Sequence, residues 1–300
     1  MKKLLLALAL ISQIALAQRI DVQTVSSIKG TETGGFYYPV FSPKGDYLLT
    51  TSENYTGLKQ YVFSNKSFKT ITTDAGAGYG VQISADGTLL AYKKNTFINN
   101  LRHSSLITQS LATGKKTILV TPTRDAITPK FAANKPQYVK SKQLVATNIT
   151  RTEATPVISI ENQKMVIYNG SNRKVLIPNG LSASYIWPSI SPDKRNIVYT
   201  VAGKGTFVCR IDGSNPVSIG KVNAPVWLNN QWIVGMDDKD DGQNTLSSTL
   251  IATTINGKTR QTILAPTGKM AMYPTASADG KHIAFNTDKG EIYILDIKIN

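Results

Sequence analysis

The chain has 300 residues, of which 41% are hydrophobic and 18% are charged, and these proportions exclude an intrinsically disordered protein. Its 34 Lys and Arg residues outnumber 19 Asp and Glu, for a formal net charge of +15 at pH 7. The single cysteine, Cys209, excludes an internal disulfide, and together with only two histidines it argues against a zinc site of Cys or several His ligands.

The first seventeen residues have the layout of a secretory signal peptide. Two lysines precede an apolar run from Leu4 to Ile14, and Ala15–Ala17 supplies the small residues that a signal peptidase requires. A membrane-spanning helix needs about 20 apolar residues, whereas this run ends at Gln18. We therefore expect a signal peptide over 1–17, cleavage before Gln18, no transmembrane segment, and a mature domain over 18–300 in the periplasm or at the cell surface.

The mature chain repeats a unit of about 40–50 residues, the length of a four-stranded propeller blade. Each unit has a Pro position, usually after an aromatic residue, then a short alternating run, a Ser-x-x-Gly type of turn and a β-rich run. The repeated position falls at Pro39, Val81, Pro129, Pro188, Pro225 and Pro274, spaced by 42, 48, 59, 37 and 49 residues. Six copies predict six blades.

Within a unit, the pattern predicts four antiparallel strands. The Pro suits the start of a strand, where its missing N–H breaks no ladder bond. Turns such as Ser42–Gly45 and Ser84–Gly87 indicate a first hairpin. A second hairpin turn recurs at Asn65-Lys66, Thr113-Gly114, Asn169-Gly170, Asp212-Gly213 and Asn256-Gly257. No stretch has a convincing helical period with caps, so helices should be few.

The last copy ends after its third strand, over Glu291 to Asp296. The segment Ile20 to Val25 alternates like a strand and belongs to no repeat, so we expect it to join the last blade and remove an exposed sheet edge. A two-sheet sandwich of hairpins is the alternative, but it does not explain the repeated register. The predicted fold is an all-β, six-bladed β-propeller with four-stranded antiparallel blades, closed by an N-terminal strand.

The repeat resembles that of the TolB family of periplasmic β-propellers. The segments PTASADGKHIAF (Pro274 to Phe285) and PSISPDKRNIVY (Pro188 to Tyr199) carry the resemblance best, and it covers roughly residues 36–297. TolB has an additional α/β domain before its propeller, whereas only about twenty residues separate the expected cleavage site from the first repeat here. The resemblance therefore implies a stand-alone TolB-like propeller. It also implies binding of a peptidoglycan-associated lipoprotein at the propeller mouth, without assigning contact residues.

Aromatic residues cluster just before the repeat strands, in positions that approach the mouth of a propeller channel. They form the candidate binding surface: Phe36, Tyr37, Tyr38, Tyr79, Tyr185, Trp187 and Tyr273. Packing between blades is the alternative role for these side chains.

Four carboxylates lie within five positions at Asp237, Asp238, Asp240 and Asp241, before Gly242. Hard oxygen ligands around a glycine turn are what Ca²⁺ requires, although the spacing does not fit an EF-hand. The sequence thus offers a candidate calcium site, with a solvated loop of turn-capping Asp residues as the alternative. We expect no other cofactor.

An enzyme is the poorer interpretation. A hydrolase would need an imidazole from His103 or His282, and no G-x-S-x-G or H-E-x-x-H motif is present. Cys209 lies within a β-rich run and is expected to be a buried small residue rather than a reactive thiol.

Basic residues are spread over every repeat, which favours anionic partners such as lipid head groups, lipopolysaccharide, acidic glycans or an acidic protein. Export makes nucleic acid an unsuitable target. We therefore predict a monomeric, exported, non-catalytic binding or scaffold protein of the bacterial envelope that recognises a protein partner through one face. The alternative is a small-ligand or glycan-binding propeller that uses Ca²⁺, and after it a glycan lyase or hydrolase.

Overall fold

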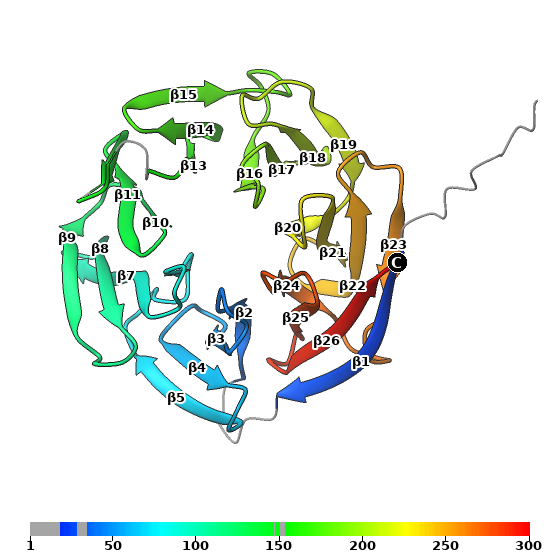
Figure 1. The fold of residues 1–300 in the computed structure, drawn as a ribbon. Helices are drawn as coiled ribbons and strands as arrows, with labels where there is room; N and C mark the ends of the chain where they lie inside the picture. The colour runs from blue at the N-terminus through cyan, green and yellow to red at the C-terminus, as the bar shows by residue number, and fades with distance from the viewer. Residues whose placement is uncertain (1–18, 29–34, 147, 151–153) are drawn as a thin grey trace, which may run out of the picture.

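The computed structural model describes residues 19–28, 35–146, 148–150 and 154–300; the expected signal peptide lies outside these ranges. The described residues form seven antiparallel sheets set around a central axis, without an α-helix (Figure 1). The fold is therefore a β-propeller, as predicted. None of the described residues belongs to a helix with the length and hydropathy that a membrane crossing needs.

Blades are numbered here in chain order. Blade 1 contains β2 (Tyr37–Phe41), β3 (Tyr47–Thr51), β4 (Leu58–Val62) and β5 (Ser67–Thr72). Blade 2 contains β6 (Gln82–Ile83), β7 (Leu89–Ile98), β8 (Leu101–Ser110) and β9 (Lys116–Thr123). Blade 3 contains β10 (Ile127–Ala132), β11 (Lys135–Lys140) and β12 (Gln143–Ala146), and blade 4 contains β13 (Val157–Glu161), β14 (Lys164–Asn169) and β15 (Asn172–Leu176).

The remaining three blades have four strands each. Blade 5 contains β16 (Tyr185–Ile190), β17 (Asn196–Val201), β18 (Gly205–Arg210) and β19 (Val217–Gly220). Blade 6 contains β20 (Asn223–Trp227), β21 (Trp232–Asp240), β22 (Thr245–Thr254) and β23 (Arg260–Ile263). Blade 7 contains β24 (Met272–Ala276), β25 (His282–Asn286) and β26 (Ile292–Ile299), completed by β1 (Ile20–Ile28).

The prediction of six blades was wrong, because the 59-residue spacing between Pro129 and Pro188 contains two blades. The second of them begins at Pro156, 27 residues after Pro129. Each of these two blades shows only three strands among the described residues, so both are shorter than the expected unit. Blade 4 also turns through Asn162-Gln163, both at positive φ, instead of the Ser-x-x-Gly turn of blades 1, 2 and 7.

The two faces of the ring differ in the loops they carry. We name as the entry face the one on which the inner strands of the four-stranded blades begin, and as the turn face the one that holds their first hairpin turns. The inner strand of blade 4, β13, runs in the opposite direction. The carbonyl of Gln163, in the β13–β14 turn, accepts a hydrogen bond of 2.9 Å from the N–H of Tyr185 at the start of β16. Blade 3 has three strands, so its last strand, β12, ends on the turn face. Blade 4 also has three strands, so its last strand, β15, ends on the entry face again.

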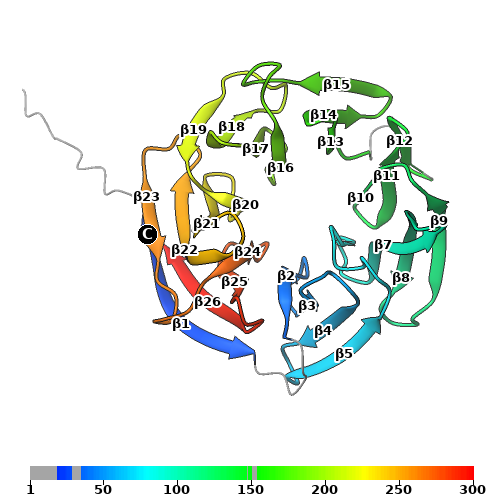
Figure 2. The ribbon, with the colours of Figure 1, turned by 180° about the vertical axis from the view of Figure 1, so that it is seen from behind.

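The ring closes as the sequence predicted. Strand β1 pairs antiparallel with β26 from Ile20↔Ile299 to Ile28↔Ile292, and the backbones of Arg19 and Asn300 exchange two further hydrogen bonds. Both views of the ribbon show β1 on the rim, outside β26 (Figures 1 and 2). Ile20 and Ile28 are buried against the neighbouring strands, so the closing strand is part of the core.

Candidate functional site

The inner strands of four blades begin with the same irregularity. The residue before the repeated Pro has a positive φ in Tyr38 (50°), Trp187 (51°), Ala224 (46°) and Tyr273 (50°). At this point each strand shifts its register against the next strand. A non-glycine residue in this conformation costs of order 1–3 kcal/mol and persists only where the surrounding structure fixes it. All four residues line the centre of the ring, so the bulge is the local feature that brings these positions to the channel.

Two adjoining cavities occupy that centre. One of about 400 Å³ is lined by the first residues of the inner strands of blades 1, 2, 5, 6 and 7. The other, of about 550 Å³, is lined by β6, β10, β13 and β16 together with Lys93 of β7. They share Tyr79, Gly80 and the segment 187–189, so the two cavities form one channel to which every blade contributes.

Tyrosine rings pack against one another on the wall of this channel. Tyr38 stacks on Tyr55 with ring centroids 4.1 Å apart, and it lies 4.7 Å from Tyr273. Tyr55 meets Tyr79 edge-on at 5.2 Å. Burial raises the pKa of Tyr38 and of Tyr273, so both hydroxyls stay protonated at neutral pH. The cluster is a rigid aromatic surface with hydroxyl groups at its edge.

The structure separates the seven aromatic residues that the sequence grouped together. Tyr38, Tyr79, Trp187 and Tyr273 line the channel. The other three pack within the blades, away from the channel. Phe36 is buried and stacks on Phe68, and Tyr37 is half-buried near the carbonyl of Asp288. Tyr185 is fully buried, and its hydroxyl is hydrogen-bonded to the backbone of Asn179 and Gly180.

The sequence did not predict that Lys93 and Arg102 lie together beside these aromatic residues. A cavity of about 370 Å³ lies between the β7–β8 hairpin and the loop 74–80, lined by Asn54, Tyr55, Gly76, Tyr79, Lys93, Asn95, Arg102 and Ser104. The hairpin pairs Asn95 with Ser104 and Phe97 with Arg102, which places these side chains on the same face as Lys93. The alternation Lys93-x-Asn95 and Arg102-x-Ser104 in two paired strands is the signal that could have revealed this face.

The cations of the channel lie in a weakly solvated, positive environment. Lys93 Nζ lies 4.5 Å from the ring centroid of Tyr79, a cation–π contact. Burial, and then the charge of Arg102, lower the pKa of Lys93 to about 8. Lys130, on β10, lines the channel with an exposed side chain, and the surrounding protein and the charge of Lys194 lower its pKa too. No carboxylate lines any of these three cavities within the described chain.

The loop 74–80 holds Tyr79 in place through contacts with two blades. The Asp74 carboxylate accepts hydrogen bonds from Lys116 Nζ (3.0 Å), Thr72 and Tyr92, and Lys94 Nζ lies 3.3 Å from it. Gly78 sits so close to Thr51 that a Cβ there would come within 2.3 Å of its hydroxyl oxygen. Tyr79 is therefore carried on a loop with little freedom to move.

The acidic residues 237–241 lie on the entry face, at the end of the β21–β22 hairpin, and each carboxylate is engaged separately. Asp237 pairs with Arg260 at 3.0 Å, and Asp238 accepts a hydrogen bond from Asn223. Asp240 and Asp241 accept hydrogen bonds from the backbone N–H groups of the loop itself. In the described part of the chain no three His, Cys, Asp or Glu side chains gather in a way that could hold a metal ion. Calcium binding here remains a prediction.

The remaining reactive side chains lie apart from the channel. His103 lies in β8 with Nδ1 2.9 Å from the Leu101 carbonyl oxygen, and His282 begins β25 with Nδ1 2.7 Å from Asp296. Cys209 is buried, and burial raises the pKa of its thiol to about 12.

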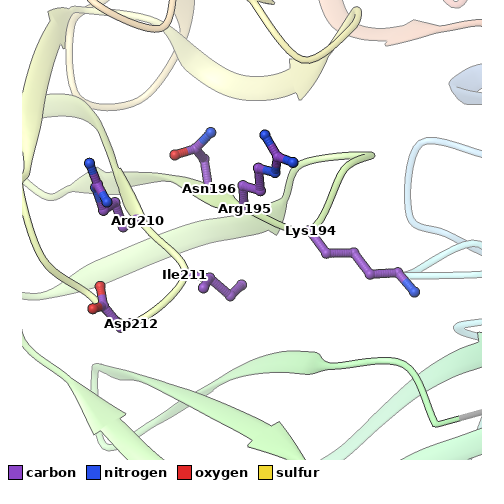
Figure 3. A pocket seen from close by; sticks show the side chains of 6 residues that line it. All are labelled: Lys194, Arg195, Asn196, Arg210, Ile211 and Asp212. Carbon is purple, nitrogen blue, oxygen red and sulfur yellow. The ribbon is translucent and has the colours of Figure 1, made fainter. Parts of the chain in front are cut away.

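A further hollow of about 530 Å³ lies on the turn face of blade 5, lined by Lys194, Arg195, Asn196, Arg210, Ile211 and Asp212. Figure 3 shows that these side chains point in different directions and do not converge on one point. This surface therefore lacks the geometry of a site.

The fold and the channel define a seven-bladed propeller, and comparisons with solved structures agree with the resemblance of its repeat. A putative TolB from Agrobacterium tumefaciens is similar over 94% of this chain and 98% of that one, with 17% identity and a TM-score of 0.57. TolB from Acinetobacter baumannii is similar over 77% of this chain, with 12% identity and a TM-score of 0.51. The matched part spans only 54% of that TolB.

Other solved propellers are as similar in shape. U3-55K matches with a TM-score of 0.62 at 9% identity, over 91% of this chain and 98% of that one. An oligogalacturonate lyase in complex with manganese matches with a TM-score of 0.53 at 15% identity, over 89% and 79%. No protein-family model and no curated protein sequence matches the chain. At these identities the likeness shows the fold alone.

Proposed function

We propose that this chain is an exported, non-catalytic binding protein of the bacterial envelope that recognises a protein partner through its entry face. The layout of residues 1–17 supports export. The TolB-like repeat and the structural likeness to TolB proteins support a role in the envelope, and a peptidoglycan-associated lipoprotein is the partner class that the resemblance implies.

The observation that carries this proposal is the unequal distribution of exposed apolar side chains. Most of those that are large lie at the ends of strands and loops of the entry face: Tyr79, Phe97, Ile98, Leu101, Ile177, Leu181, Ile186, Trp187, Leu246 and Leu264. The others, Val25, Ile118, Val175 and Val217, lie on outermost strands. No described turn on the turn face carries an exposed large apolar side chain. Exposed aromatic and apolar groups gathered on one side favour a protein partner.

The channel lining supports binding rather than catalysis. Aromatic, amide, hydroxyl and cationic groups line the channel and the cavity beside it, and no histidine, cysteine or carboxylate does so among the described residues. Histidine and carboxylates are the most common general bases, and cysteine is a common nucleophile. A rigid ring with an aromatic mouth is suited to recognition without chemistry.

Cross-linking in cells with the tagged protein, followed by mass spectrometry of the captured material, tests the proposal. We expect one envelope protein to be enriched, and to be lost with Tyr79→Ala or Trp187→Ala, whose side chains are 58% and 42% exposed. Ile118→Ala, on the outermost strand β9, is the matched control and should retain capture. Capture that never exceeds background, or that Ile118→Ala abolishes equally, contradicts the proposal.

Binding of an anionic glycan is the second candidate function. The cations of a channel without carboxylates favour it, and one structural neighbour is an oligogalacturonate lyase. Titration with oligogalacturonate, with and without Ca²⁺, tests it against an Asp240→Ala/Asp241→Ala variant. Binding that needs Ca²⁺ and is lost in this variant would support a calcium-dependent glycan site.

A further inference from the structure

We propose that the cavity between the β7–β8 hairpin and the loop 74–80 binds the carboxylates of an acidic segment of the partner protein. This inference rests on the proposed function and names the chemistry that the entry face recognises. It assigns Lys93 and Arg102 as the anion-binding residues, with Tyr79, Asn95 and Ser104 beside them.

The cavity presents hydrogen-bond donors and positive charge without an internal counter-ion. Neither Lys93 nor Arg102 forms an ion pair with another described residue, and Lys93 has only the ring of Tyr79 as its close partner. Of the nearby carboxylates, Asp74 is engaged by Lys94 and Lys116, and Glu53 is not among the residues that line this cavity. Two cations held close together without an acid favour an incoming anion.

The chemistry of the donors fits carboxylates. The planar guanidinium of Arg102 can donate two parallel hydrogen bonds to one carboxylate, and the ammonium of Lys93 acts as a compact charge for a second. The amide of Asn95 and the hydroxyl of Ser104 already bond each other at 2.8 Å, which fixes the floor between the two cations. The cavity, of about 370 Å³, has room for acidic side chains but not for a folded domain.

The surroundings favour a peptide over a glycan as the source of these carboxylates. The tip of the same hairpin exposes Phe97 (72%), Ile98 and Leu101. Phe97 lies opposite Arg102 in the hairpin register, so a bulky apolar side chain and a cation stand side by side. A polypeptide in which acidic and apolar residues alternate can contact both, whereas an acidic polysaccharide has no aliphatic side chains for the tip.

Fluorescence anisotropy with a labelled peptide of sequence LDEFDEL tests the inference, with LNQFNQL as the neutral probe of the same shape. We expect LDEFDEL alone to bind, and its affinity to fall at least about tenfold in Lys93→Met and in Arg102→Met, because hydrogen bonds between charged groups are lost. Lys115→Met, on the turn face of the same blade, is the matched control and should bind normally. Lys93→Arg should retain most of the affinity.

Three outcomes would overturn the inference. The first is equal binding of the neutral peptide, and the second is an equal loss of peptide affinity in Lys115→Met. The third is a trigalacturonate that binds as tightly as LDEFDEL and loses affinity in Lys93→Met and Arg102→Met. The last outcome would transfer the site to glycans. Cross-linking in cells distinguishes a failure of this inference from a failure of the proposed function. If Lys93→Met/Arg102→Met still captures the partner while Tyr79→Ala does not, the entry face binds a protein but this cavity does not receive its acidic groups.

Discussion

Lys116 Nζ lies 3.0 Å from Asp74 Oδ2, and this contact ties the outermost strand of blade 2 to the loop that leaves blade 1. Burial alone would raise the pKa of Asp74, but hydrogen bonds from Lys116, Thr72, Tyr92 and Lys94 outweigh it and lower the pKa to about 2. The ionised carboxylate therefore stabilises the folded state. The same contact holds the loop that carries Tyr79.

We expect Asp74→Asn to lower the free energy of unfolding by about 1–2 kcal/mol at neutral pH, because both lysines lose their counter-charge. Since the folded pKa lies below the ordinary value of 3.8, the stabilisation is complete above that pH and is lost as the pH falls towards 2. Urea unfolding from pH 2 to pH 7 measures both effects. Asp288→Asn, at an exposed carboxyl, is the control; an equal loss there would contradict the prediction.

Lys93 should destabilise the fold. Its pKa of about 8 lies below the ordinary 10.5, so the unfolded chain binds more protons between these values and stability should rise with pH across that window. Lys93→Met is expected to raise the free energy of unfolding by about 1–2 kcal/mol at pH 7. This is less than the whole shift in the pKa of Lys93 would imply, because the side chain is partly exposed to solvent. Denaturation at pH 7 and at pH 10.5 checks this, since the gain should shrink at the higher pH. A stability gain independent of pH would show that packing, not charge, is responsible.

Closure of the ring gives a third prediction. Ile28 is buried beside Phe36 and Ile292, whereas Val25 on the same strand is exposed. Ile28→Ala should cost about 2–4 kcal/mol of stability through lost burial and a cavity, and Val25→Ala should cost less than about 0.5 kcal/mol. Thermal unfolding of the two variants provides the comparison. Similar losses would mean that β1 contributes by backbone pairing alone.

The bulges at the channel predict an unusual effect of glycine. Ala224 has a φ of +46°, so Ala224→Gly should relieve backbone strain and stabilise the protein by about 0.5–1 kcal/mol. Ala276→Gly, on the inner strand β24 and without a positive φ, should instead destabilise it by about 1 kcal/mol. Denaturant unfolding of both variants decides. Destabilisation by both would show that the bulge at Ala224 carries little strain.

Much of the architecture could be predicted because its signals are local. A Pro at the start of an inner strand, a Ser-x-x-Gly turn and an alternating run each specify backbone geometry within a few residues, and together they identified the propeller and its closing strand. Blade 4 was missed because Pro156 has neither an aromatic residue before it nor a Ser-x-x-Gly turn after it, and because it lies only 27 residues after Pro129. The number of blades follows from how sheets pack around the ring, which no single repeat specifies.

Only part of the candidate site could be predicted, because the rest depends on the register between strands. Tyr38, Trp187 and Tyr273 precede the repeated Pro, and the bulge there directs them to the channel, whereas Tyr185 lies two residues before Trp187 and packs into the blade. Lys93 and Arg102 lie nine residues apart, and only the register of the β7–β8 hairpin places them on one face. Sequence spacing alone does not reveal that register.

The reversed strand β13 lies at a junction with little apolar packing. Blades 3 and 4 meet through a small apolar cluster of Val139, Val157, Val166 and Tyr168, far smaller than the one that joins blades 6 and 7. This junction lies across the ring from the closing strand (Figure 1). Because less apolar surface is buried there, we expect the contact between blades 3 and 4 to open more easily than the contact between blades 6 and 7.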